Sequence, residues 1–364
     1  MIAAIVALVA FNGAAAAQRG TAAAEASAAR SDAKAIWGPV SIGGKSEFPV
    51  YHGLGVGIFE MALKWAAAAP TPPSNASDPA DPAYRWPANI SYAIQQASRY
   101  HMRVMLQVSA TPAWANGGAG WTYPPADVGA LGQFLTAASR RFPSIHLWMI
   151  WGEPDGQANF ALTTNVSWRA RRLTPSQARA PHIYAEMLDA SYGALKRVSA
   201  SNLVIGGDTY AWGNIPTRLW VENLRLANGR PPRMDLYGHN PFCWRNPNLA
   251  NPPSPDGFYD FSDLSRLSRL VNSNLATKGH QIKLFLSEWT IPTSPLDHEF
   301  NFYVTPSVQA QWIRDAWRIV RGSPWFYALG WIHLQDDPPG QGTTGGLLDY
   351  RGHPKPGYYA FKDG

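Results

Sequence analysis

The amino-acid sequence predicts an α/β fold, a single (β/α)8 barrel. Short β-branched or aliphatic segments alternate along the chain with longer segments of helical pattern, which is typical of parallel βα units. We count eight of the short segments, and the length of 364 residues accommodates one barrel of roughly 250 residues with insertions. No shift in composition marks a second domain. We therefore expect one TIM-type barrel over residues 35–364.

The predicted elements follow in order along the chain. The strands are expected at residues 35–42, 56–63, 103–109, 145–151, 203–207, 234–238, 282–287 and 328–334. Helices are expected at residues 90–100, 128–141, 180–200, 217–228, 260–277 and 305–321. Only residues 47–54 separate the first two strands, and no full helix fits there. Pro- and Asn-rich stretches at 70–87 and 245–255 are predicted as βα-loops, on the barrel face where active sites of this fold lie.

The N-terminal segment 1–34 has a different character. An apolar run at residues 2–11 is followed by four alanines at 14–17, as in the apolar core and cleavage region of a secretory signal. We predict a signal-peptide-like segment and a flexible leader, and hence a secreted, extracellular protein, with an uncleaved anchor as the alternative. The apolar run is shorter than a membrane span, so no stable membrane insertion of the mature protein is expected.

Composition excludes several classes of protein. The net charge is +6, but 31 Lys and Arg residues are offset by 25 acidic ones and do not gather in one segment, which indicates a solvated basic surface and no nucleic-acid partner. Cys243 is the one cysteine, which excludes an intrachain disulfide and makes a cysteine-based zinc site implausible. The sequence leaves the oligomeric state open.

Two predicted strands end at a glutamate. The strand at 145–151 leads through Gly152 into Glu153, and the strand at 282–287 leads into Glu288. Strands of a closed barrel can direct two carboxyl groups to one point above its mouth, as needed to attack and protonate a glycosidic bond from two sides. The alternative is that each glutamate is a loop acid paired with an arginine. The aliphatic strands and the flanking tryptophans favour the catalytic interpretation.

These two strand ends resemble motifs of a known group. The sequences Trp-Met-Ile-Trp-Gly-Glu-Pro at 148–154 and Leu-Ser-Glu-Trp at 286–289 are similar to the strand-four and strand-seven motifs of the clan A retaining glycoside hydrolases, the cellulase-like superfamily, with a looser likeness to family 39. The resemblance implies a retaining O-glycosidase acting on an oligo- or polysaccharide by double displacement. It makes Glu153 the acid/base and Glu288 the nucleophile, with a carbohydrate as partner and no cofactor.

The resemblance also implies sugar contacts. Residues 235–242 are similar to the strand-six segment whose His or Tyr contacts the nucleophile, which singles out Tyr237, His239 and Asn240, and hydrogen bonds from the first two are expected to keep Glu288 ionised. Trp331 matches the aromatic platform under the sugar. Further tryptophans at or after strand ends are candidates for stacking on sugar rings: Trp65, Trp114, Trp121, Trp212, Trp244 and Trp289.

Gly152 is a departure from the clan's pattern. The clan usually has an asparagine directly before the acid/base, which donates to the sugar 2-hydroxyl, and glycine has no side chain to do so. Asp208, Asn240 or Gln335 is expected to make this contact instead. The departure also supports an alternative function, a carbohydrate-binding barrel that does not hydrolyse its ligand. A third reading, a metal-dependent barrel hydrolase, is disfavoured because no His pairs occur at the predicted strand ends.

Overall fold

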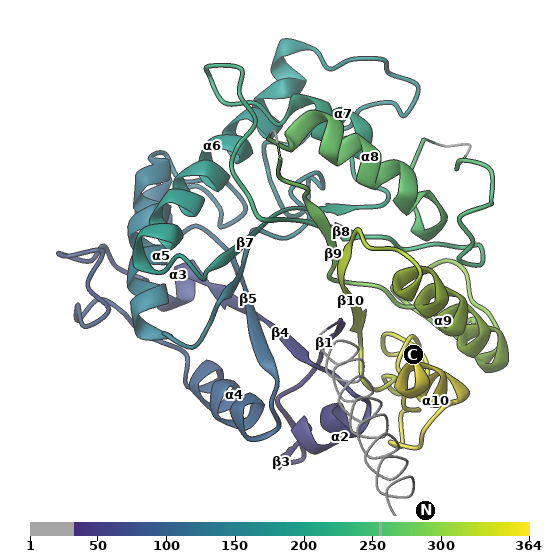
Figure 1. Ribbon diagram of the computed structural model, residues 1–364. Helices are drawn as coiled ribbons and strands as arrows, with labels where there is room; N and C mark the ends of the chain where they lie inside the picture. Colours follow the sequence, from purple (N-terminus) through teal and green to yellow (C-terminus); the bar gives the residue numbers. More distant parts are fainter. Residues whose placement is uncertain (1–32, 255–256, 278) are drawn as a thin grey trace, which may run out of the picture.

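The computed structural model describes residues 33–254, 257–277 and 279–364, and in these parts eight parallel strands form one closed barrel (Figure 1). The signal-like segment therefore lies outside the described residues. The barrel strands are β1 (Lys34–Trp37), β4 (Ile58–Lys64), β5 (Arg103–Ser109), β6 (Leu147–Ile150), β7 (Leu203–Tyr210), β8 (Leu236–Asn240), β9 (Lys283–Leu286) and β10 (Phe326–Ile332). Their order around the barrel is β1, β10, β9, β8, β7, β6, β5, β4. The predicted fold class is confirmed.

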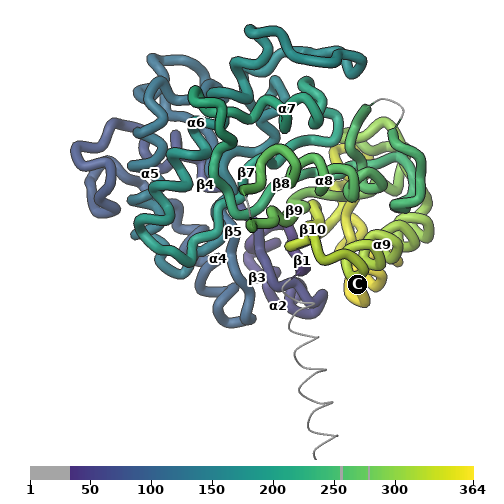
Figure 2. Tube along the Cα trace, turned by 45° about the horizontal axis from the view of Figure 1, so that its top comes forward, coloured from purple at the N-terminus to yellow at the C-terminus, as the bar shows by residue number. Residues whose placement is uncertain are grey.

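Helices surround the barrel on its outside (Figures 1 and 2). They are α2 (Phe48–Gly53), α3 (Trp65–Ala68), α4 (Ala88–Arg99), α5 (Val128–Arg141), α6 (Pro175–Val198), α7 (Thr217–Asn223), α8 (Leu264–Leu275), α9 (Pro306–Arg321) and α10 (Pro356–Asp363), with short 3-10 turns at Ala113–Ala115 and Phe261–Asp263. None of those in the described residues is both long and apolar enough to cross a membrane.

The core has two layers, because side chains alternate between the two faces of each strand. A smaller cluster fills the barrel interior, where Ile58, Met105 and Phe285 meet residues of other strands. A larger cluster lies between the strands and the surrounding helices and contains the largest rings, Trp148 and Trp331 among them. Because successive residues of a strand face alternately inward and outward, only every second residue can direct its side chain toward the barrel mouth.

The first predicted strand is too long. β1 ends at Trp37, and Ser41–Ile42 instead pairs with Lys45–Ser46 in a small antiparallel hairpin, β2 and β3. Gly38 and Pro39 interrupt the strand, since proline has no amide hydrogen to donate. The interruption releases the chain onto the rim of the barrel directly after Trp37.

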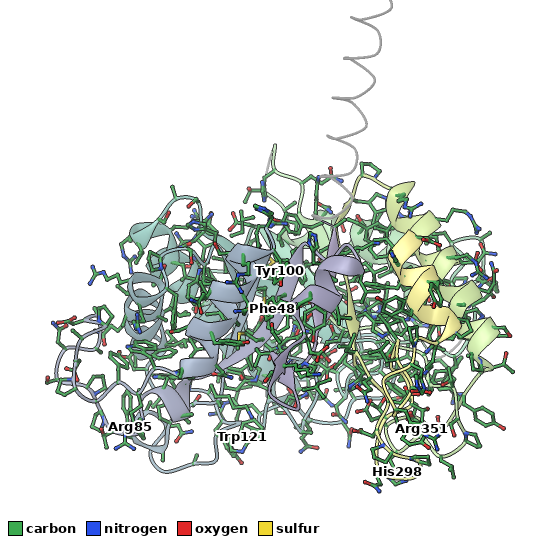
Figure 3. The ribbon with its side chains drawn as sticks, turned by 90° about the horizontal axis from the view of Figure 1, so that it is seen from below. Phe48, Arg85, Tyr100, Trp121, His298 and Arg351 are labelled. Carbon is green, nitrogen blue, oxygen red and sulfur yellow. The ribbon has the colours of Figure 1, made fainter. Side chains whose placement is uncertain are left out.

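The βα-loops gather at one end of the molecule. Figure 3 shows Arg85, Trp121, His298 and Arg351, each from a loop that follows a barrel strand, along the same edge, with Tyr100 nearer the opposite end. This is the carboxyl end of the strands, and both predicted glutamates follow strands that end there.

Candidate active site

Glu153 is placed by a sharply turned backbone after β6. Trp151 and Glu153 have φ values of 68° and 44°, a left-handed conformation that costs non-glycine residues about 1–3 kcal/mol each and tends to occur at functional sites. Two backbone hydrogen bonds hold the turn: the Trp151 amide donates to the Val108 carbonyl at 2.8 Å, and the Glu153 amide donates to the Asp208 carbonyl at 3.0 Å. The turn is therefore fixed against the neighbouring strands β5 and β7.

Asn240, the last residue of β8, connects the two glutamates. Its Nδ2 donates to Glu153 Oε1 at 2.9 Å, and its Oδ1 accepts from the backbone amide of Glu288 at 3.0 Å. A second amide, Asn159 Nδ2, donates to Glu153 Oε2 at 3.1 Å. Asn240 is fully buried, so its orientation is fixed by these two bonds. The structure thus brings Asn240 against the Glu153 carboxylate and the backbone of Glu288.

The two carboxyl groups influence each other's protonation. Burial raises the pKa of Glu153 above its ordinary value, while the amides of Asn240 and Asn159 partly offset the rise. The pKa of Glu288 is raised well above its ordinary value by burial and then by repulsion from Glu153, Asp208 and Glu299. Close carboxylates do not readily ionise together, so this pair retains a proton at pH values where isolated glutamates have lost theirs.

Asp208 lies beside Glu153 at the end of β7. It is fully buried, with φ of 47°, and Gln107 Nε2 donates to its Oδ2 at 3.3 Å. A Cβ at Gly238 would come within 2.9 Å of the Asp208 backbone, so a larger residue at position 238 would displace Asp208. Burial, and next the Glu153 charge, raise the pKa of Asp208 well above its ordinary value.

Gln107 explains how the site accommodates Gly152. A Cβ at position 152 would lie 2.7 Å from Gln107 Nε2 and 2.9 Å from its Cδ. The amide of Gln107, which comes from β5, therefore occupies the volume that a side chain at position 152 would fill. The sequence prediction missed Gln107, although its position near the end of a predicted strand was a usable signal.

A further buried carboxyl lies inside the barrel below Glu288. Glu60 of β4 is fully buried, and Ser287 Oγ donates to its Oε2 at 2.8 Å. Trp37 Nε1 in turn donates to Ser287 Oγ at 2.9 Å. Ser287 immediately precedes Glu288, so these hydrogen bonds link the segment that carries the nucleophile candidate to Trp37 at the rim. The sequence prediction missed both Glu60 and Trp37.

Tyr237 and His239 lie elsewhere than expected. His239 Nδ1 pairs with Thr209 Oγ1 at 2.8 Å and its Nε2 with the Tyr259 carbonyl at 2.7 Å, while the Tyr237 hydroxyl pairs with Thr209 at 3.2 Å. Leu236 and Asn240 face the interior, and the intervening odd positions face the helices. The expected hydrogen bonds to Glu288 are therefore replaced by bonds within the outer layer, and burial lowers the pKa of His239 to about 4.

Three of the expected sugar-stacking tryptophans belong to the core. Trp331 is 0% exposed and packs edge-on against Trp289 and Phe361 in the outer layer, so it is not a platform at the mouth. Trp289 is equally buried, and Trp65, the first residue of α3, stacks on Phe134. These positions correct the expectation that the three rings contact sugar.

Other aromatic residues do reach the rim. Trp212 and Trp244 stack with ring centroids 4.9 Å apart, and Trp244 is 49% exposed. Tyr210, whose pKa Glu153 helps to raise, packs edge-on against Trp212. This pair of indoles therefore lies on the Glu153 side of the mouth.

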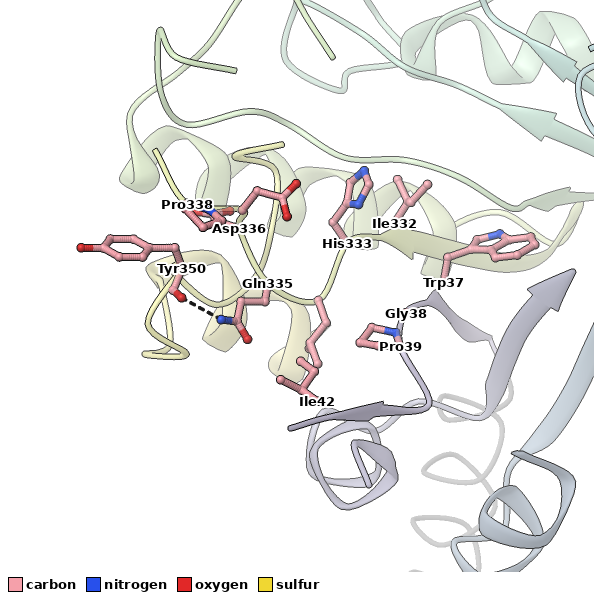
Figure 4. Close-up of a pocket in the computed structure, with 12 residues that line it drawn as sticks. Trp37, Gly38, Pro39, Ile42, Ile332, His333, Gln335, Asp336, Pro338 and Tyr350 are labelled. Carbon is pink, nitrogen blue, oxygen red and sulfur yellow. Dashed lines mark hydrogen bonds between the residues drawn. The ribbon is translucent and has the colours of Figure 1, made fainter. Parts of the chain in front are cut away.

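Gln335 lies apart from the glutamates. Its Nε2 donates to the Tyr350 carbonyl at 2.9 Å (Figure 4), in a pocket beside β10. For metal binding, the described residues contain no group of three His, Cys, Asp or Glu side chains placed as ligands.

Comparison with known proteins gives likenesses of structure. No family model and no curated protein matches this chain. A family 39 glycoside hydrolase from Bacteroides cellulosilyticus WH2 matches with a TM-score of 0.66 and 16% identity, over 91% of this chain and 62% of that one. A glucosidase from Croceicoccus marinus matches with a TM-score of 0.63 and 15% identity, over 91% and 65%.

A monomeric β-xylosidase from Caulobacter crescentus CB15 is similar as well, with a TM-score of 0.61 and 16% identity, over 92% of this chain and 67% of that one. This chain thus spans about two thirds of the length of these three proteins. At such identities the likeness establishes the fold: the barrel resembles those of family 39 and clan A enzymes, in agreement with the resemblance of the two glutamate motifs.

Proposed function

We propose that this protein is a retaining glycoside hydrolase, with Glu288 as nucleophile and Glu153 as acid/base. The observation that carries the proposal is the Asn240 bridge, which joins the two glutamates from β6 and β9 at the barrel mouth. The raised pKa values of both carboxyls support it, because a reaction needing one acid and one base requires a carboxyl that still holds its proton.

Two displacements make up the proposed reaction. A Glu288 oxygen attacks the anomeric carbon, the glycosidic C–O bond breaks, and the Glu153 proton passes to the leaving oxygen. Water then attacks the same carbon from the side of the departed group, Glu153 takes up a proton from this water, and the ester bond to Glu288 breaks. No metal ion or organic cofactor takes part in either displacement.

The first step needs the proton on Glu153, although two amides favour its ionised form in the empty site. A sugar hydroxyl that donates to Glu288 stabilises the carboxylate there. Substrate binding would thereby move the shared proton from Glu288 to Glu153. In this proposal the Gln107 amide beside Gly152, which donates to Asp208 Oδ2 in the empty site, donates to a further hydroxyl when substrate is bound, the role expected of Asp208, Asn240 or Gln335.

Separate substitutions of the two glutamates test the proposal. Glu288→Ala should abolish turnover of aryl glycosides, and azide should restore it with a product of inverted configuration, because the anion replaces the nucleophile. Glu153→Ala should slow hydrolysis of substrates with poor leaving groups by roughly 10²–10⁴-fold, retain its first step on activated aryl glycosides, and give an azide product of retained configuration.

Proton NMR of the azide products reads the configuration directly. Glu186→Ala serves as the control, because this exposed glutamate lies on α6 and its loss should leave the rate unchanged. If Glu288→Ala gave the retained product and Glu153→Ala the inverted one, Glu153 would be the nucleophile and Glu288 the acid/base. Carbohydrate binding without turnover by the unaltered protein would instead favour the non-hydrolytic barrel.

A further inference from the structure

A pocket of about 630 Å³ opens on the rim between β1 and β10 (Figure 4). This size falls within the roughly 300–1,000 Å³ of small-molecule sites. One wall comes from the segment after β1 and the other from the end of β10 and the loops beyond it. The lining residues are Trp37, Gly38, Pro39, Ile42, Ile332, His333, Leu334, Gln335, Asp336, Asp337, Pro338 and Tyr350.

The pocket is hydrogen-bonded to the residues on both sides of Glu288, to the Ser287 hydroxyl and to the Trp289 carbonyl. Trp37 in its wall donates to Ser287, the residue before Glu288, at 2.9 Å. Ile332 in its other wall donates its amide to the carbonyl of Trp289, the residue after Glu288, at 3.1 Å. The pocket therefore adjoins the two residues that flank Glu288 in the sequence, while Glu288 itself is not one of its lining residues.

Glu153 lies on the opposite side of the barrel mouth. Around the closed barrel, β9, β8 and β7 separate β10 from β6 in one direction, and β1, β4 and β5 separate them in the other. An acid that protonates the leaving oxygen lies toward the leaving group. The part of the substrate that stays on the nucleophile must consequently extend away from Glu153, toward β10 and β1.

We infer that this pocket binds a second, neutral sugar of the substrate, on the side of the cleaved bond away from the leaving group. The inference rests on the proposed function. An enzyme that removes only terminal sugars needs no space beyond the sugar it releases. The pocket provides such space, so the substrate is an oligo- or polysaccharide that is cut inside its chain.

The lining residues favour an uncharged sugar. Trp37 and Tyr350 offer aromatic surface for the C–H face of a sugar ring, and His333, Gln335 and Asp337 offer polar groups at its edge. None of the twelve lining residues is Lys or Arg. Asp336 is paired with Lys355 at 2.9 Å, so this cation is already neutralised. A uronate in the pocket would meet the Asp337 carboxyl and no lining Lys or Arg that could pair with it.

Aryl mono- and diglycosides distinguish the two ways of cutting. The probes are the 4-nitrophenyl monoglycosides and the corresponding 4-nitrophenyl diglycosides of xylose, glucose, galactose and mannose, with diglycosides whose outer sugar is glucuronic acid as the acidic probes. We expect 4-nitrophenol to leave a diglycoside together with an intact disaccharide, detected by mass spectrometry. With a neutral outer sugar the kcat/KM should exceed that of the monoglycoside about tenfold, and with glucuronic acid as the outer sugar this gain should be absent.

Two tyrosine variants locate the effect. Tyr350→Ala, at a 40% exposed pocket residue, should lower the diglycoside-to-monoglycoside ratio of kcat/KM at least fivefold. Tyr359→Ala is the matched control, since Tyr359 is 56% exposed on α10 outside the pocket lining, and it should leave the ratio unchanged. Both side chains are exposed, so neither change is expected to disturb folding.

Each outcome decides the inference. Release of single sugars from the non-reducing end, or a ratio unaffected by Tyr350→Ala, would overturn the second subsite while leaving glycosidase function intact. If no glycoside is cleaved, the proposed function fails, and calorimetry with the same unmodified neutral disaccharides then decides: binding weakened by Tyr350→Ala supports the pocket as a sugar site, and no binding overturns it.

Discussion

Gly152 and Gln107 share one small volume beside Glu153, and this shared volume makes their roles interdependent. The Gln107 amide lies where a side chain at position 152 would begin. In the strand-four motif alone, Gly152 is the loss of an asparagine side chain. In the barrel, Gln107 of the adjacent strand β5 occupies the space that this side chain would fill. Sequence reasoning could find the glycine but not its neighbour, because the pairing of β5 with β6 becomes visible only in the barrel.

This interdependence gives a prediction for a double-mutant cycle. Gly152→Asn alone should lower kcat/KM because its Cβ collides with Gln107, and Gln107→Ala alone should lower it about tenfold, equivalent to about 1.4 kcal/mol, through loss of an amide donor. The combined variant should be more active than the product of the single effects, since the new asparagine then has both space and a function. Strictly multiplicative effects on aryl glycoside hydrolysis would contradict the shared volume.

At the scale of elements, strand ends were predictable and strand faces were not. Aliphatic runs located β6 and β9 and hence Glu153 and Glu288, because parallel buried strands are nearly continuous apolar segments. The same continuity hides which residues face inward, so Trp331 and His239 were expected at the mouth and lie in the outer layer. Trp37 was missed because the segment 35–42 was read as one strand.

Helix boundaries show a similar limit. The prediction began α6 at residue 180, whereas the helix begins at Pro175 after Thr174, whose hydroxyl accepts from the Gln177 amide while the Gln177 side chain accepts from the Thr174 amide. This capping box was readable in the sequence. Pro181 lies inside the helix, where proline normally disfavours helical structure. The packing of α6 against α5 and β7 outweighs this local cost.

The close approach of β10 to the site predicts a sensitive glycine. A Cβ on Gly330 would lie 2.0 Å from the Ser287 carbonyl and 2.5 Å from Glu60 Oε1. Gly330→Ala should therefore cost about 1–3 kcal/mol in the free energy of unfolding and lower activity, because the displaced Ser287 precedes Glu288. Urea unfolding monitored by tryptophan fluorescence measures the first effect.

Gly53→Ala is the matched control for this change. Gly53 ends α2, and nothing lies within 4 Å of a Cβ added there, so its free energy of unfolding should change by less than about 0.5 kcal/mol. Equal unfolding midpoints for the two variants would show that β10 can move away from β9 without cost.

For the whole molecule, the barrel and the loops at its mouth concentrate buried acidic groups. Glu60, Asp155 and Asp208 are fully buried, and burial raises the pKa of each well above its ordinary value. Burial also raises the pKa values of Glu153 and Glu288. The site thereby holds the protons that the proposed reaction requires, at the expense of stability when these protons are lost.

The sign of this effect gives a prediction for stability against pH. A carboxyl whose pKa is raised by folding contributes most below its unfolded pKa, near 4, and its contribution is lost as pH rises through the folded value, by about 1.4 kcal/mol per pH unit for each group. Glu60→Gln, which keeps an oxygen to accept from Ser287, removes one such group. Its thermal midpoint should equal that of the unaltered protein near pH 4 and exceed it increasingly between pH 5 and pH 8. Calorimetric melting curves over this range measure the difference. Parallel curves would mean that Glu60 ionises in the folded barrel as readily as in the unfolded chain, and that its proton contributes nothing to the stability of the site.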